Sequence, residues 1–251
     1  ASVIEWRRQK RRERERERVL QSGGAARHCE LAYLLYTSGS TGRPKGVGVL
    51  QENVPNLLQW FSCSEFQMTS GDTFLWQASI SFDHVVTHVF WTAQCEATLC
   101  VASDGVETRV DEMVRLIEKA RVSVLFMVPS HLATVAMQTP PAHDLGRVRL
   151  LMTAGEALSV AAAQTFGTLC ATAELWNVFG PTETTVDVSQ YNVAKETSAA
   201  NLQFRKSVPI GRAFFNTQLS LWSGSRTAAT PKCLLVIGGR SVGGGYLNMP
   251  D

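Results

Sequence analysis

The chain has 251 residues, of which 45% are hydrophobic and 18% charged, a balance typical of a globular protein with one large or two smaller domains. No apolar run approaches the roughly 18 residues that a membrane-spanning helix needs, so membrane insertion is not expected. The formal net charge is +2, but residues 1–18 hold eight of the 24 Lys/Arg and only four of the 22 Asp/Glu, so the rest of the chain is close to neutral.

Residues 1–30 are expected to form a charged tail that is disordered or a frayed helix. Nucleic-acid binding is the alternative for such a basic run, but Trp6 is the one aromatic residue near the charges, so no nucleic-acid partner is expected. The cysteines form no CxxC pair, and no signal peptide precedes them. We therefore expect reduced thiols in a cytoplasmic protein.

From Leu31 onward, short apolar runs rich in β-formers alternate with stretches of helical period. Strands are predicted at residues 31–37, 73–79, 97–103, 122–128, 149–155 and 174–180, and helices at 50–61, 84–94, 108–120, 129–138 and 157–171. This alternation predicts an α/β fold with a doubly wound, mostly parallel sheet and helices on its faces, over residues 31–189. Ligands bind such sheets beyond the carboxyl ends of the strands, and the first predicted strand ends at such an edge.

The pattern changes after Val186, where apolar runs follow one another without intervening helices. These strand-like runs lie at residues 207–215, 217–222, 232–239 and 243–247. They predict a small β-rich subdomain over residues 190–251. No domain-closing signal precedes Asp251, so this subdomain is expected to be truncated.

The loop after the first predicted strand, TSGSTGRPKG, is rich in glycine and hydroxyl side chains. Small side chains let backbone N–H groups and hydroxyls turn toward one ligand, which we expect to be anionic. The loop is not a Walker A motif, because Lys45 follows a proline and precedes a glycine rather than a serine or threonine. A flexible linker is the alternative, but it would lack the preceding strand and the Pro-Lys-Gly ending.

A second motif, WNVFGPTETTVDVS, spans residues 176–189. Gly180 and Pro181 turn the chain after a strand. Thr182 then offers a hydroxyl, and Glu183 offers a hard carboxylate suited to Mg²⁺ beside phosphates. Taken alone, the motif is better explained as a β-turn with a helix cap, but the first motif beside it favours the phosphate-binding interpretation.

Together the two motifs resemble the signatures of the adenylate-forming enzymes, the superfamily of acyl-CoA synthetases, luciferases and the adenylation domains of nonribosomal peptide synthetases. The likeness runs from Leu31 to Asp251 and is closest to the adenylation domains. It implies that the chain is the middle of the large N-terminal domain of such an enzyme. The ribose-binding aspartate motif and the C-terminal domain with its catalytic lysine are expected to lie outside it.

The resemblance implies ATP and Mg²⁺ as cofactors, catalytic roles for Lys45, Thr182 and Glu183, and a metal-ligand role for Glu183. It also implies that Lys45 and residues of both motifs and of the TAGEA segment contact the nucleotide. These further residues are Thr37, Ser38, Gly39, Ser40, Thr41, Gly42, Gly155, Glu156, Asn177, Phe179, Gly180 and Thr182. Phe179 would stack on adenine where the family usually has tyrosine.

ISFDHVVTHVFW, residues 80–91, favours the amino-acid-activating branch of the family. Asp83 matches the carboxylate that pairs there with the substrate α-ammonium, and a fatty-acid pocket has no use for a buried negative charge. The resemblance implies a substrate pocket lined by Asp83, His84, Thr87, Ser130, Met152, Ala154, Val178, Val186 and Asp187. Several of these are polar, which hints at a polar or basic substrate. His84 and His88 are alternatively a zinc pair, but no glutamate lies between them and no third ligand is evident.

The implied activity is ATP-dependent activation of a carboxylic acid, most plausibly an α-amino acid, to an acyl adenylate with release of pyrophosphate. The acyl group would then pass to a phosphopantetheine thiol on a partner carrier-protein domain. An acyl- or aryl-CoA synthetase is one alternative. A catalytically incomplete nucleotide-binding fragment is the other.

Overall fold

The computed structural model describes residues 31–38, 43–139, 145–196, 206–223 and 233–247. These residues form two compact units. The larger unit contains the described residues within 58–181 and 186–215, and the smaller unit contains those within 31–57, 182–185 and 216–247. The charged tail predicted over residues 1–30 lies outside the described residues.

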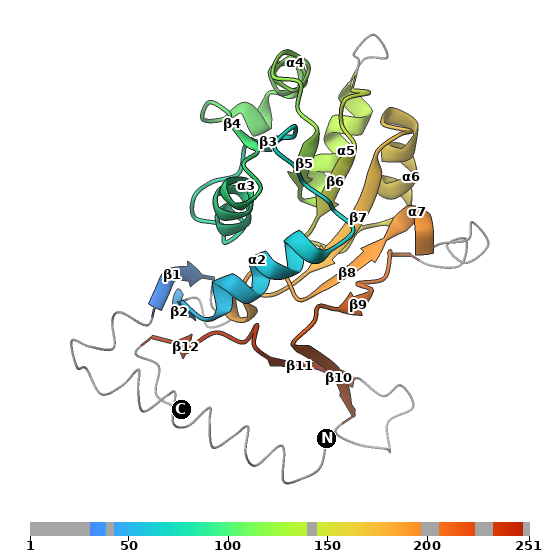
Figure 1. Ribbon diagram of the computed structural model, residues 1–251. Coiled ribbons are helices and arrows are strands. Elements are labelled where there is room, and N and C mark those ends of the chain that lie inside the picture. Colours follow the sequence, from blue (N-terminus) through green and yellow to red (C-terminus); the bar gives the residue numbers. More distant parts are fainter. Residues whose placement is uncertain (1–30, 39–42, 140–144, 197–205, 224–232, 248–251) are drawn as a thin grey trace. The chain divides into compact units, whose positions relative to one another are not determined.

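The larger unit is built on a seven-stranded sheet with the strand order β4-β3-β5-β6-β7-β8-β9 (Figure 1). Neighbouring strands from β4 to β7 run parallel, whereas β8 pairs antiparallel with both β7 and β9. The strands are β3 (Thr73–Trp76), β4 (Thr98–Val101), β5 (Val124–Met127), β6 (Leu150–Thr153), β7 (Glu174–Phe179), β8 (Ser189–Asn192) and β9 (Arg212–Ala213). The predicted doubly wound, mostly parallel sheet is therefore confirmed.

Three amphipathic helices pack on one face of this sheet: α4 (Val110–Lys119), α5 (Pro129–Gln138) and α6 (Val160–Leu169). Successive strand residues point to opposite faces, so alternate apolar residues of the parallel strands join these helices in one buried core. On the strand side this core includes Leu75, Leu125, Met127, Leu151 and Leu175. The helices predicted over 108–120, 129–138 and 157–171 are confirmed, with α5 starting at its predicted proline.

Aromatic side chains cover the opposite face of the sheet. They come in part from α2 (Asn53–Cys63) and from a π-helical turn, Thr87–Trp91, that continues into α3 (Thr92–Gln94). The ring of Phe66 packs edge-on against Trp176 of β7 at 4.9 Å between centroids, and Phe74 of β3 packs edge-on against Trp91 at 5.9 Å. The sheet is thus buried on both faces, as a parallel sheet requires.

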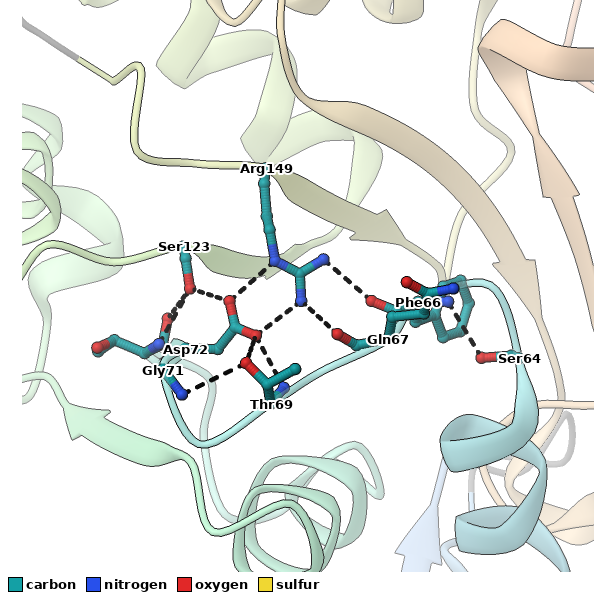
Figure 2. Close-up of polar contacts among 9 residues, drawn as sticks. Ser64, Phe66, Gln67, Thr69, Gly71, Asp72, Ser123 and Arg149 are labelled. Atoms are coloured by element: carbon teal, nitrogen blue, oxygen red, sulfur yellow. Dashed lines mark hydrogen bonds and ion pairs between the residues drawn. The ribbon is translucent and has the colours of Figure 1, made fainter.

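A polar network ties together the amino ends of β3, β5 and β6 (Figure 2). Asp72, Ser123 and Arg149 each lie just before one of these strands. Arg149 donates to both carboxylate oxygens of Asp72 at 2.9 and 2.8 Å and to the carbonyls of Phe66 and Gln67, both at 3.0 Å. The Ser123 hydroxyl donates to Asp72 Oδ1 at 2.7 Å. Burial alone would raise the pKa of Asp72, but hydrogen bonds from Arg149 and Ser123 hold it well below its usual value.

The smaller unit contains two antiparallel sheets. In one, β2 (Lys45–Leu50) lies between β1 (Leu31–Thr37) and β12 (Gly245–Tyr246); the other pairs β10 (Thr217–Ser223) with β11 (Cys233–Gly239). The prediction that the first strand belongs to the parallel sheet is wrong, because β1 pairs with β2, a strand that was not predicted. The glycine-rich loop is therefore the loop of a β-hairpin.

Short elements complete the described structure. They are the 3₁₀ turns Val106–Thr108 and Thr182–Thr184 and the helix α7 (Val193–Glu196). None of the helices in the described ranges is both long and apolar enough to cross a membrane.

Candidate functional site

The predicted substrate-pocket residues of the larger unit lie at or beyond the carboxyl ends of its parallel strands. Met152 lies near the end of β6 and Ala154 directly after it. Val178 lies near the end of β7, and Ser130 is the second residue of α5, which follows β5. Eight of the nine predicted residues are buried, and Ser130 is exposed. This edge is the usual ligand edge of such a sheet, whereas the Asp72–Arg149 network occupies the opposite edge.

Three charged residues of the predicted pocket meet, although one is about 100 positions from the other two. His84 lies between two buried carboxylates, with Nδ1 at 3.2 Å from Asp83 Oδ1 and Nε2 at 3.6 Å from Asp187 Oδ1. Its ring packs on Phe126 of β5, with 4.0 Å between the ring centroids. Asp187 is only 1% exposed. An imidazolium between two carboxylates compensates charges that would otherwise be unpaired in the interior.

The pKa values of the two histidines of this segment shift in opposite directions, although burial by itself lowers both. For His84, burial favours the neutral ring, but the carboxylates of Asp187 and Asp83 outweigh it and raise the pKa to about 9. For His88, burial dominates and lowers the pKa to about 4. His88 contacts the backbone carbonyl of His84 through Nδ1 at 2.7 Å, and its ring stacks on Phe74. The two rings use different partners, which does not support a zinc pair.

An unusual backbone brings Asp187 into place. Thr185 and Val186 both have positive φ angles, 61° and 68°, which are strained for β-branched residues. The chain then returns against Gly180, where an added Cβ would overlap the Val186 carbonyl oxygen and lie 2.5 Å from Asp187 Cα. Only glycine fits this approach, which explains Gly180 in the second motif.

Several residues predicted to contact adenine also have structural partners within the larger unit. Gly155 has a φ of 85°, which favours glycine. The Glu156 carboxylate accepts hydrogen bonds from the backbone N–H and hydroxyl of Ser130, both at 3.0 Å, and so caps the start of α5. Asn177 donates its amide to the Pro209 carbonyl at 2.8 Å. Phe179 ends β7 and is half-buried. Their contacts with a nucleotide stay predictions.

The residues predicted to hold phosphates belong to the smaller unit. Thr37 ends β1 and pairs across the hairpin with Lys45, the first residue of β2, while Ser38 follows and is exposed. The Lys45 ammonium lies over the ring of Tyr246 at 5.1 Å, a cation–π contact. Gly39, Ser40, Thr41 and Gly42 lie outside the described residues.

Glu183 is held at both its backbone and its side chain. Its carbonyl accepts a hydrogen bond from the Gly243 N–H at 2.9 Å, and its carboxylate accepts one from the Tyr246 hydroxyl. This hydrogen bond is the main reason that the pKa of Tyr246 is raised to about 12. Tyr246 was not predicted as a site residue, because the sequence around it indicates only a strand. Thr182 begins the same 3₁₀ turn as Glu183.

Glu183 offers a single carboxylate, which would suit a magnesium ion whose other ligands came from a nucleotide and water. Within the described ranges, no group of three or more His, Cys, Asp or Glu side chains could hold a metal. Mg²⁺ commonly takes one or two carboxylates and completes its shell with phosphate oxygens and water. A single positioned carboxylate is the contribution expected of a protein that binds Mg²⁺ together with a nucleotide.

Comparison with known proteins places the chain in a family. A family model described as AMP-binding enzyme matches residues 4–247, so the chain belongs to the AMP-binding enzyme family. Over 87% of its length it is 33% identical to the D-alanine–D-alanyl carrier protein ligase of Bacillus velezensis, of which it covers 43%. Over 88% of its length it is 31% identical to the L-proline–L-prolyl-carrier protein ligase of Pseudomonas fluorescens, of which it covers 44%.

Solved structures agree with the fold. The chain is similar to the Vibrio cholerae adenylation domain AlmE in complex with glycyl-adenosine-5'-phosphate, with a TM-score of 0.73 and 26% identity over 88% of this chain and 41% of that one. A crystal structure of the nonribosomal peptide synthetase FmoA3 gives a TM-score of 0.75 over 87% of this chain and 23% of that one. The predicted resemblance to adenylation domains is confirmed. The chain spans less than half the length of each of these relatives.

Proposed function

We propose that the protein to which this chain belongs activates an α-amino acid with ATP, forming an aminoacyl adenylate and pyrophosphate. The observation that carries this proposal is a buried carboxylate, Asp83, 7% exposed, in a chain of the AMP-binding enzyme family. Asp83 shares one cation, His84, with the buried carboxylate of Asp187, so the pair needs a second positive charge, which the α-ammonium of an amino acid would supply. The glycyl adenylate bound to AlmE supports this substrate class.

In the proposed reaction the amino-acid carboxylate attacks the α-phosphorus of ATP. A new phosphorus–oxygen bond forms, and the bond to the bridging oxygen of pyrophosphate breaks. Lys45 would neutralise the β- and γ-phosphates, and Thr182 would donate its hydroxyl near the α-phosphate. Glu183 would hold Mg²⁺, which neutralises phosphate charge when it is bound. Phe179, Gly155, Glu156, Asn177 and Gly180 would form the adenine-binding surface. The protein contributes mainly positioning and charge neutralisation.

The aminoacyl group would pass from the adenylate to a phosphopantetheine thiol on a carrier protein. The D-alanyl and L-prolyl carrier protein ligases among the relatives support such a partner. We further propose a cytoplasmic location, since Cys63, Cys95, Cys100 and Cys170 are free thiols in the described structure.

The test is exchange of labelled pyrophosphate into ATP by the intact protein, with a panel of amino acids and their des-amino analogues. Amino acids should drive exchange, and their des-amino analogues should not. Asp83→Ala should reduce exchange strongly, by at least about a hundredfold, because the α-ammonium loses its buried partner. Equal exchange with both substrate classes would favour an acyl- or aryl-CoA synthetase. Nucleotide binding without any exchange would indicate a protein that does not turn over.

A further inference from the structure

The charges around His84 constrain the substrate side chain. Asp83, His84 and Asp187 are at most 9% exposed, and the imidazole lies within 3.2 Å of one carboxylate and 3.6 Å of the other. With His84 protonated, the three side chains carry one net negative charge. His88, a further titratable side chain next to His84, is buried and adds no charge when neutral.

We propose that His84 is a built-in counter-cation shared by the two buried carboxylates, Asp83 and Asp187, so that the site selects an amino acid with an uncharged, hydrogen-bonding side chain. This inference rests on the proposed amino-acid activation. It replaces the broader expectation of a polar or basic substrate with a narrower one that excludes basic side chains.

The charge balance supplies the first argument. Protonated His84 compensates one of the two negative charges of Asp83 and Asp187, and the α-ammonium of a bound amino acid would compensate the other. A lysine-like side chain would therefore leave one buried positive charge without a partner. A glutamate-like side chain would leave one buried negative charge. Either excess is unfavourable in an interior site, whereas a neutral side chain leaves the set balanced.

Unpartnered polar atoms supply the second argument. Among the described residues, both carboxylate oxygens of Asp187, Nε2 of His84 and Oγ1 of Thr87 are buried without a hydrogen-bond partner. All three residues belong to the predicted pocket. An aliphatic substrate would leave these atoms unsatisfied, which is costly. A carboxamide or ureido group both donates and accepts, so it could donate to Asp187 and accept from His84.

Pyrophosphate exchange by the intact protein tests the inference with two pairs of amino acids of similar shape. Citrulline and arginine differ in a positive charge, and glutamine and glutamate differ in a negative charge. We expect the neutral member of each pair to have a higher kcat/KM by at least about tenfold. Equal or better activity with arginine or glutamate in the parent protein would overturn the inference.

Three variants at His84 and Asp187 distinguish a substrate preference caused by charge from one caused by the shape of the pocket. His84→Gln removes the counter-cation, so the preference should shift toward arginine by at least about tenfold. Asp187→Asn leaves His84 charged and should shift the preference toward glutamate, while the double variant should restore the neutral preference. Unshifted preferences in both single variants would overturn the inference even if the parent favours neutral substrates. Exchange driven only by acids without an α-amino group would instead refute the proposed function, and this inference with it.

Discussion

Replacing Arg149 by lysine should destabilise the larger unit while keeping the charge. The guanidinium donates four hydrogen bonds, two to Asp72 and one each to the carbonyls of Phe66 and Gln67. A lysine ammonium is a single point and cannot span these four acceptors, so at least two bonds should be lost. Hydrogen bonds to charged groups contribute about 1.5–3 kcal/mol each, so two buried bonds would contribute about 3–6 kcal/mol. Because the Arg149 side chain is 40% exposed, solvent screening reduces the expected loss to about 2–3 kcal/mol.

Scanning calorimetry of the intact protein measures this loss. For a unit of this size, about 2–3 kcal/mol corresponds to a fall in Tm of roughly 4–12 °C. Arg109→Lys is the matched control, because Arg109 forms an exposed i,i+3 pair with Glu112 and should change stability by less than about 0.5 kcal/mol. Equal Tm values for the two variants would refute the reasoning. Arg149→Ala should cost more, about 3–5 kcal/mol, since Asp72 would keep its buried charge without the cation.

Three further predictions concern the site. Glu183→Gln should raise the Mg²⁺ concentration needed for half-maximal pyrophosphate exchange by at least about tenfold, because the cation loses a carboxylate ligand. Tyr246→Phe should raise this concentration less. An unchanged magnesium dependence in Glu183→Gln would mean that the turn at Thr182–Thr184 is structural. Because burial lowers the pKa of His88 to about 4 from 6.5, the unfolded chain binds more protons between these values and stability falls as pH drops through this window. Urea titrations at pH 7 and pH 4.5 measure the decline in the free energy of unfolding, and His88→Gln should reduce this decline by about 2–3 kcal/mol. Equal declines in the parent protein and in His88→Gln would contradict this prediction. Residues 1–251 alone should show no Lys45-dependent pyrophosphate exchange, because much longer relatives supply further segments; robust exchange lost in Lys45→Ala would contradict it.

The parallel sheet was predictable because its strands and helices carry strong local patterns. The buried residues of α4, for example, are Val110, Met113, Val114 and Ile117, which follow the helical period. The hairpin partner β2 was missed, because KGVGVL combines two glycines with a short apolar run and gives a weak strand signal. The pairing of β1 with β2 rather than with the parallel sheet depends on tertiary contacts that no local pattern encodes.

The residues of the candidate site could be proposed from the sequence, whereas their arrangement in space could not. Position along the strands places the predicted pocket residues at one edge of the sheet, and the resemblance supplies their roles. The contact of His84 with Asp187 joins residues about 100 positions apart, and it depends on two left-handed residues that are not glycines. The hydrogen bond from Tyr246 to Glu183 spans 63 positions and has the same long-range character.

The close approach at Gly180 has a consequence for any attempt to change the substrate. Because the backbone at Gly180, directly after β7, lies against the backbone at Val186 and Asp187, these two segments of the predicted pocket cannot move apart independently. A larger residue at position 180 would displace both backbone segments and would not enlarge the pocket. Loop insertions or grafts across residues 179–187 should therefore fail more often than side-chain exchanges at Val178 or Val186. Reprogramming of this pocket is limited to the volume and charge that individual side chains can supply.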